Sequence, residues 1–440
     1  MPINSEHPTY DITRAVITED AYNGNVEQEK YVPKLADQSK TKYQQYLDRG
    51  IYFNVTSRTA SAITGTVLRK DPIMDDSFQV VDELSEREFL SDLLNGLLLR
   101  GRSGIHVDFD EDVNSAVMIP INGNNIVNWR DDGSLVVLKE GFYVEDKDDK
   151  YELIAKVRYR ELFLDEGTYT VQLWEQEGGN KSSKFVRVGE PMIPTIKGVP
   201  LDYIPFKFIN PFDTTDDVYS PVLYNLGEIN ISHFRTSVDL EHIAHFSALP
   251  QPWIAGDFQS SGDVDEQPLK VLVGSDQVWH LSPESKVGYL EFSGMAIDSV
   301  ADILRHKEEQ MLAVGIRLLS NKNAVESAET IKIRSNTENA TLLSMTLAVE
   351  SAVASSLETV NLWNGITEEP LFSMSKDFVP SQIAPEEIEI QLQLLNEGKI
   401  SQETFLENLS AGEIIPSVDE EVERLNATTV DGQNVDNEDL

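Results

Sequence analysis

The clearest periodic signal in the chain is a series of long helical patterns between residues 219 and 363. Apolar residues at helical spacing predict one helix over 219–249 and a second over about 296–319. A strand-rich insert, 250–292, separates them, and a short polar loop then leads to a third helix over about 328–363. Two helices around a small strand-rich insert, followed by a very long helix, favour a ring subunit over an enzyme built around a pocket.

Ahead of these helices the pattern is mixed. Residues 1–40 show turn signals and no long period, which predicts an extended arm or irregular lobe. Residues 41–68 predict a helix roughly 40 Å long, with Gly50 as a possible break. Ser85 is a suitable N-cap for a further helix over 86–99.

Residues 104–209 change to alternating apolar and polar positions, with Gly, Asn and Asp clusters between the runs. This pattern predicts an antiparallel, hairpin-rich region. The insert adds three strand candidates: Lys270–Val273, Gln277–Leu281 and Gly288–Phe292. After Trp363 a small helical pair is expected at Pro385–Asn396 and Gln402–Leu409.

Composition narrows the possible functions. The chain has 75 acidic and 36 basic residues and a formal net charge of −39. Such a surface fits either a solubility adaptation, as in a saline habitat, or a surface that nucleic acid must pass without sticking. Cysteine is absent, so disulfides, thiol nucleophiles and thiolate metal sites are excluded. Neither a signal peptide at the N-terminus nor an apolar run of about 20 residues is expected.

The enzyme motifs with a clear mechanism are missing. No GxxxxGK[ST] loop occurs, which excludes a P-loop ATPase, and GxGxxG, HExxH and GxSxG are also absent. His242 and His245, three residues apart on a helix, are a weak candidate metal pair. The acidic strand end at 108–112 fits a cation site or, more simply, a solvated turn.

Several short traces, taken in their order along the chain, resemble one family. They are Tyr31-Val32-Pro33-Lys34-Leu35, Arg69-Lys70-Asp71-Pro72, Gly101-Arg102-Ser103-Gly104, Ile126-Val127-Asn128-Trp129, Pro205-Phe206-Lys207-Phe208, Leu226-Gly227-Glu228-Ile229-Asn230, His233-Phe234-Arg235, Gly288 to Gly294, and Gly398-Lys399-Ile400-Ser401 with Thr404 and Leu409. The chain thereby resembles bacteriophage portal proteins, the rings at the unique capsid vertex through which DNA enters and leaves. The likeness is strongest to a branch found in short-tailed phages, and it covers most of residues 30–412.

The resemblance implies an α+β portal fold with four parts. These are a mixed α/β wing (1–218, with a long wing helix at 328–363), a stem of two helices (219–249 and 294–318), a strand-rich clip (250–293) and a short helical crown (364–412). A tunnel loop, 319–327, joins the second stem helix to the wing helix, and an acidic, disordered tail follows from 413 to 440.

The resemblance also implies a function and partners. Portals form homo-oligomeric rings, typically of twelve copies, that conduct double-stranded DNA without sequence specificity during packaging and ejection. Their partners are the major capsid protein, the terminase motor and, in the virion, a tail adaptor. No enzymatic activity, cofactor, metal or membrane is implied, and the protein is expected in the virion after assembly in the host cytoplasm.

The second stem helix has two faces in the sequence. Ile297, Val300, Leu304, Met311, Val314 and Leu318 form an apolar seam, expected to pack on neighbouring copies. Asp298, Asp302, Arg305 and Glu309 form a polar seam, our candidate channel lining, in which Arg305 and Glu309 are spaced for an attractive contact. The same pattern fits an ordinary amphipathic helix with a solvated back.

The tunnel loop carries the candidate DNA contacts Arg317, Asn321, Lys322 and Asn323. Cations at a helix C-terminus explain Arg317 and Lys322 equally well. Two rival functions stay open at this point: a hydrolase built on 104–209, and another virion structural protein such as a tail adaptor.

Overall fold

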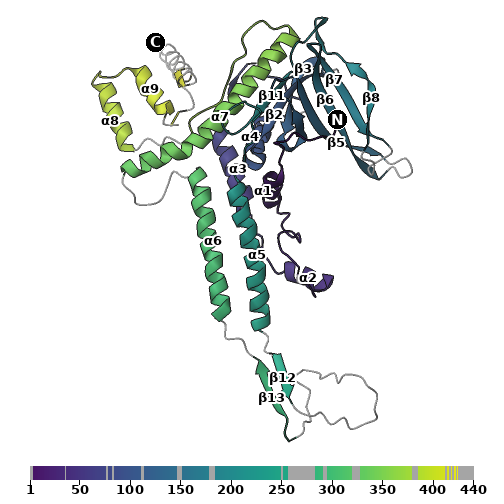
Figure 1. Cartoon of the computed structure of the whole chain (residues 1–440). Helices are drawn as coiled ribbons and strands as arrows, with labels where there is room; N and C mark the ends of the chain where they lie inside the picture. Colours follow the sequence, from purple (N-terminus) through teal and green to yellow (C-terminus); the bar gives the residue numbers. More distant parts are fainter. Residues whose placement is uncertain are drawn as a thin grey trace, which may run out of the picture.

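Two long antiparallel helices project from a mixed α/β body in the computed structural model of this chain (Figure 1). The first is α5 (Tyr224–Ser247) and the second is α6 (Met295–Leu319). A hairpin of β12 (Gln251–Ala255) and β13 (Lys286–Leu290) lies beyond their far end. The structure describes residues 3–378, with gaps at 35, 76–77, 82–83, 111–112, 146–150, 178–183, 249–250, 256–282, 291–294 and 320–327, then 385–411 and scattered residues up to 424.

The body contains two main antiparallel sheets, as the alternating pattern predicts. The larger has the order β4-β5-β6-β7-β8 and the smaller β11-β2-β3. Their strands are β2 (Ser103–Asp110), β3 (Ser115–Asn122), β4 (Ile126–Trp129), β5 (Leu135–Glu145), β6 (Leu153–Asp165), β7 (Thr168–Gln176), β8 (Phe185–Met192) and β11 (Phe206–Ile209). A short hairpin, β9 (Thr195–Ile196) with β10 (Val199–Pro200), and a 3-10 turn, η1 (Gly123–Asn125), complete the region.

Helix α4 (Glu86–Arg100) lies at the centre of the main core, as the leucine-rich sequence favours. Ser85 caps it as expected. Its hydroxyl accepts a hydrogen bond from the Glu88 N–H at 3.3 Å, and the Glu88 carboxylate accepts one from the Ser85 N–H at 3.0 Å. Gly101 ends the helix in the left-handed conformation at φ 70°. A Cβ there would lie 2.2 Å from the Tyr219 carbonyl oxygen, so only glycine lets the start of the stem approach so closely.

Helix α7 (Ala328–Asn364) closes the same core from the other side. Its buried face includes Met345, Val349, Val353 and Leu357. The chain after it returns to the body, where β14 (Phe372–Ser373) pairs with β1 (Ile73–Met74). Helices α8 (Pro385–Asn396) and α9 (Gln402–Ala411) form the expected small pair, drawn to the left of the body in Figure 1.

In the N-terminal region, the break expected at Gly50 is present and the expected irregular arm contains a helix. Residues 41–68 form two helices, α2 (Lys40–Leu47) and α3 (Val55–Val67), because Gly50 and the Asn54 cap interrupt the pattern. The first 40 residues contain α1 (Thr13–Asn23), which packs on α4 and α5. Its buried face consists of small residues, Ala15, Thr18 and Ala21, so it gives almost no apolar periodicity.

Two further features bear on the sequence analysis. The segment Ala340–Asn364 of α7 is long and apolar enough to cross a membrane by length and composition, although we expected no such segment, and half of it is buried. In the insert, β13 coincides with the third strand candidate, whereas 270–273 and 277–281 lie outside the described residues. The tail, 413–440, also lies almost entirely outside them.

Candidate functional site: the two-helix stem

Lys307 connects the two stem helices through hydrogen bonds. Lys307, on α6, donates from Nζ to the Ser232 carbonyl oxygen at 2.9 Å, to the Ser232 hydroxyl at 2.8 Å and to the Thr236 hydroxyl at 2.6 Å. All three acceptors belong to one turn of α5. Partial burial, with the nearby charge of Arg235, lowers the pKa of Lys307. An ammonium group whose donors meet neutral oxygens in this way fixes the register of the two helices.

The apolar seam of α6 faces α5 and the body of the same chain. Met311 is 1% exposed, Val314 packs against the main core, and Ile297, Val300 and Leu304 are half-buried. Within the chain, Met311 and Val314 are thus packed on the body, whereas contact of the half-buried Ile297, Val300 and Leu304 with neighbouring copies stays a prediction. An amphipathic helix covers its apolar face with the nearest partner, and here α5 is that partner.

The polar seam lies on the opposite side of α6. At 3.6 residues per turn, Asp298, Asp302, Arg305 and Glu309 point nearly opposite to Lys307. All four side chains are exposed. Three acids and one base leave a net charge of −2 per copy on this face.

The ion pairs of the polar seam differ from the expectation. Arg305 pairs with Asp302, three residues earlier, at 2.5 Å, and Glu309 lies 3.8 Å from the His306 ring. The expected contact between Arg305 and Glu309 is not formed. Both pairs are exposed, so each stabilises the helix only marginally.

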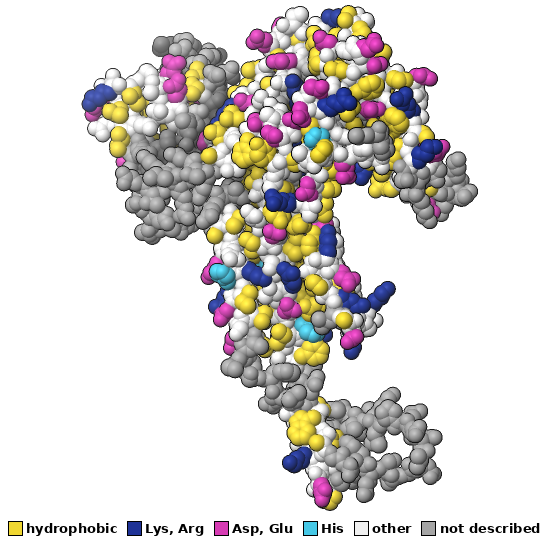
Figure 2. All heavy atoms as spheres, viewed as in Figure 1, with side chains coloured by type: hydrophobic (Ala, Val, Ile, Leu, Met, Phe, Trp, Pro, Cys, Tyr) yellow, Lys and Arg dark blue, Asp and Glu magenta, His cyan; other side chains and the backbone are white. Residues whose placement is uncertain are grey.

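Helix α5, by contrast, is covered on its far side by the N-terminal segment. Leu47 of α2 packs with Ile231, Phe234 and Val238 of α5. Gly50 lies against the same surface, where a Cβ would come 2.3 Å from a Val238 methyl group. The charged face of α6 is exposed, and α5 also exposes charged residues, among them Glu228 and Arg235. Acidic and basic side chains are both seen along the stem in Figure 2.

The candidate loop contacts are only partly placed. Arg317 belongs to the last turns of α6, within Met295–Leu319, and its side chain is not described. Asn321, Lys322 and Asn323 lie outside the described residues. Their proposed role as DNA contacts stays a prediction.

The β12–β13 hairpin exposes aromatic side chains. β12 and β13 pair antiparallel, with Trp253 opposite Gly288. Trp253 is 43% exposed and Tyr289 is 63% exposed. A Cβ at Gly288 would come 2.9 Å from the Trp253 indole nitrogen, so the glycine leaves room for the ring. Two strands this small cannot bury a core by themselves.

His242, of the candidate metal pair His242 and His245, has other partners. The His242 ring stacks edge-on with Tyr46, and its Nδ1 lies 3.4 Å from the Arg49 guanidinium. Burial and the charge of Arg49 lower the pKa of His242. In the part of the chain that the structure describes, no group of three or more His, Asp or Glu side chains could hold a metal ion.

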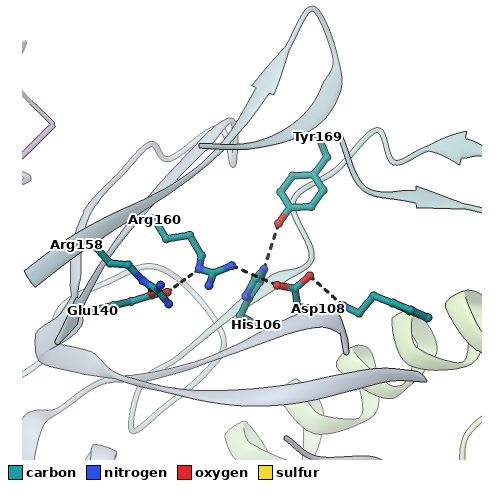
Figure 3. A network of polar contacts seen from close by, with 7 residues as sticks. His106, Asp108, Glu140, Arg158, Arg160 and Tyr169 are labelled. Carbon is teal, nitrogen blue, oxygen red and sulfur yellow. Dashed lines mark hydrogen bonds and ion pairs between the residues drawn. The ribbon is translucent and has the colours of Figure 1, made fainter. Parts of the chain in front are cut away.

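The acidic strand end instead contributes to a network that joins the two sheets (Figure 3). Asp108, on β2, pairs with Arg160, on β6, at 3.3 Å. Glu140, on β5, accepts from Arg160 at 2.6 Å and from Arg158 at 2.5 Å. These carboxylates are engaged by guanidinium groups and do not form the facing pair of acids that a hydrolase on 104–209 would use.

His106 and Tyr169 are the most buried members of this network. The His106 Nε2 and the Tyr169 hydroxyl lie 3.1 Å apart. Burial lowers the pKa of His106 to about 4 and raises the pKa of Tyr169. Both groups are therefore neutral at pH 7, and the network holds the sheets together.

Lys307 and Asn230 are two important residues that the sequence analysis missed. Lys307 interrupts the apolar seam of α6, and Asn230 lies on the buried face of α5. A polar residue at an apolar position of a helical pattern is the signal that could have found both, because such a residue must have a hydrogen-bond partner.

Comparisons with known proteins match the region around the stem and, for solved structures, most of the chain. A family model described as "Domain of unknown function (DUF4055)" matches residues 222–364, about a third of the chain. No curated protein matches. Among solved structures, one chain from "Neck of native GTA particle computed with C12 symmetry" aligns with a TM-score of 0.43 and 12% identity, over 92% of this chain and 95% of that chain. A chain from "Virion of native gene transfer agent (GTA) particle" aligns with a TM-score of 0.42 and 12% identity, over 91% and 99%.

Proposed function

We propose that this chain is a phage portal protein, the subunit of a ring at the unique capsid vertex. Twelve copies would enclose a channel for DNA packaging and ejection. The body is the wing, α5 and α6 are the stem, the β12–β13 hairpin belongs to the clip, and α8 with α9 forms the crown. In this proposal the chain is a structural conduit that acts in the virion and has no catalytic role.

One observation carries the proposal: the face of α6 opposite Lys307 is charged and exposed along its described length. α2 packs against one part of α5, and the charged face of α6 lies on the side of α6 opposite Lys307, which contacts α5. When copies are arranged around an axis with α2 outside, the α6 helices line the centre. Asp298, Asp302, Arg305 and Glu309 then face the channel.

The charge of that lining suits passage of DNA. Duplex DNA binds protein by exchanging counterions for Lys and Arg contacts. Each copy offers one arginine on this face, and Asp302 already pairs with it. Repeated around a ring, a net acidic wall gives DNA no deep binding well, so the duplex can slide.

The clip would dock the partners outside the capsid. Its exposed Trp253 and Tyr289 suit a contact that a two-stranded hairpin cannot make alone. We infer that the strands complete a sheet with the neighbouring copy and that the outer end meets the terminase motor or the tail adaptor. The wing would contact the major capsid protein.

Electron microscopy of the purified full-length chain tests the proposal. We expect rings with a central hole, and sedimentation as a closed oligomer at micromolar concentration. A stable monomer of 49.4 kDa under these conditions would refute the portal. Open or helical assemblies with no closed ring would favour a different virion structural protein.

A further inference from the structure

The outward face of α7 is apolar although nothing in the described part of the chain covers it. Successive outward positions along the helix are Ala340, Leu343, Leu347, Ser351, Glu358 and Leu362, all exposed. Leu343 is 37% exposed, Leu347 is 45% exposed and Leu362 is 52% exposed. Spacings of three, four and seven residues place them in one stripe, which we call the α7 stripe.

The helix as a whole has the composition of a buried element. Its segment Ala340–Asn364 has only two charged residues, Glu350 and Glu358, yet half of it is buried. Glu350 turns toward the body, where it pairs with Lys376 at 2.7 Å. A helix that is apolar on all sides is normally covered on all sides. In one copy of the chain, this side of α7 is exposed.

We propose that a second copy of this chain covers the α7 stripe. The inference rests on the proposed ring and names one of its contact faces. Its main support is charge: each copy has a net charge of −39, so two copies repel wherever charged surfaces meet. Between 340 and 357 the stripe carries no charge on its outward positions, which makes it a place where two such copies can approach closely.

A lipid surface fits the stripe less well. The opposite side of α7 holds the main core through Leu342, Val349 and Val353, each at most 3% exposed, so the helix cannot leave the body to insert. The stripe also ends in Glu358, beside Leu362. A charge at that position is costly in hydrocarbon but tolerable at the rim of a protein contact.

The absence of cysteine allows a direct test. Leu347→Cys places a single thiol on the stripe, and Leu392→Cys places one on α8 as the control, since Leu392 is 46% exposed against 45% for Leu347. In the isolated ring we expect a maleimide to react at least about tenfold more slowly at position 347, because a covered site reacts only when the contact opens. Both variants should react equally in urea.

A second pair of variants tests the energetics. Leu347→Glu should prevent ring formation at micromolar concentration while circular dichroism shows a folded chain, and Leu392→Glu should assemble as the parent does. Equal maleimide rates in the ring, or normal assembly of Leu347→Glu, would overturn the contact and leave the portal proposal intact. A parent chain that never assembles would refute both the contact and the portal proposal. Slower labelling only with phospholipid vesicles would assign the stripe to a membrane and also refute the contact.

Discussion

The carboxamide oxygen of Asn230, in α5, accepts a hydrogen bond from the backbone N–H of Thr56, in the first turn of α3, at 3.1 Å. The same oxygen accepts from the Val55 N–H and from the Thr56 hydroxyl, each at 3.0 Å. Its amide nitrogen donates to the Phe53 carbonyl at 2.8 Å. A stem residue thus caps a helix of the body, and the stem leaves the body at a fixed joint.

Replacing Asn230 should loosen this joint. We expect Asn230→Ala to lower the free energy of unfolding by about 2–4 kcal/mol, because several buried donors lose their acceptor. Urea denaturation of the unassembled chain would measure the change. Asn225→Ala, at an exposed position of the same helix, is the control and should change it by less than about 0.5 kcal/mol. An equal effect of the two substitutions would show that the cap does not stabilise the joint.

Two glycines should respond in opposite ways to alanine. Gly101 has φ 70° and faces the Tyr219 carbonyl, so Gly101→Ala should destabilise the chain by more than about 1 kcal/mol. Gly65 lies within α3 and a Cβ there meets nothing within 4 Å, so Gly65→Ala should stabilise it by about 0.5–1 kcal/mol. Thermal unfolding would measure the stability of both variants. A stabilising effect of Gly101→Ala would contradict the close approach of the stem to Gly101.

The sequence predicts the long helices well because their period extends over many turns. α5, α6 and α7 begin and end within a few residues of the expected positions. α1 was missed since Ala15, Thr18 and Ala21 bury too little apolar surface to give a period. Short-range patterns thus identify elements whose burial depends on large side chains.

The partners of each face could not be predicted in the same way. The α6 pattern gives one apolar and one polar seam, but it does not say whether α5 or a neighbouring copy covers the apolar one. That choice depends on how the helix pair closes, which Lys307 and its contacts with Ser232 and Thr236 determine. The Asn230 cap likewise joins residues 174 positions apart, beyond the reach of any local pattern.

The network between the sheets should make the body sensitive to acid. Burial lowers the pKa of His106 to about 4, against about 6.5 in an unfolded chain. Between these values the unfolded chain binds a proton that the folded chain does not, so stability falls as the pH drops from about 6.5 to 4. Burial alone would raise the pKa of Glu140, but Arg160 and Arg158 outweigh it and lower the pKa. Protonation of Glu140 therefore lowers the stability further as the pH falls below about 4.3.

Urea denaturation at several pH values between 7 and 4.5 would measure this dependence. We expect His106→Gln to flatten it, because the titrating group is gone. His245→Gln, at an exposed position of α5, is the control and should leave the dependence unchanged. An unaltered pH dependence in His106→Gln would show that another group titrates in this range.

The orientation of the stem gives the most demanding prediction. The double variant Asp298→Lys/Asp302→Lys turns the charged face of α6 from net −2 to net +2 per copy. Both positions are exposed and lie on the side of α6 opposite Lys307, so rings should still form. If this face lines the channel, the new positive levels will bind duplex phosphate and release counterions. DNA should then bind the empty ring at low salt and dissociate as salt rises, and packaging should stall.

A matched variant separates channel charge from total charge. Glu368→Lys/Glu369→Lys changes the net charge by the same amount at exposed positions remote from the stem. Screening at physiological salt acts over about 8 Å, so charges on the outer surface should not affect DNA in the channel. We expect this variant to package DNA at the parental rate and to gain no salt-dependent affinity for it. If the two variants behave alike, Asp298 and Asp302 do not face the channel, and α5 or another surface must line it.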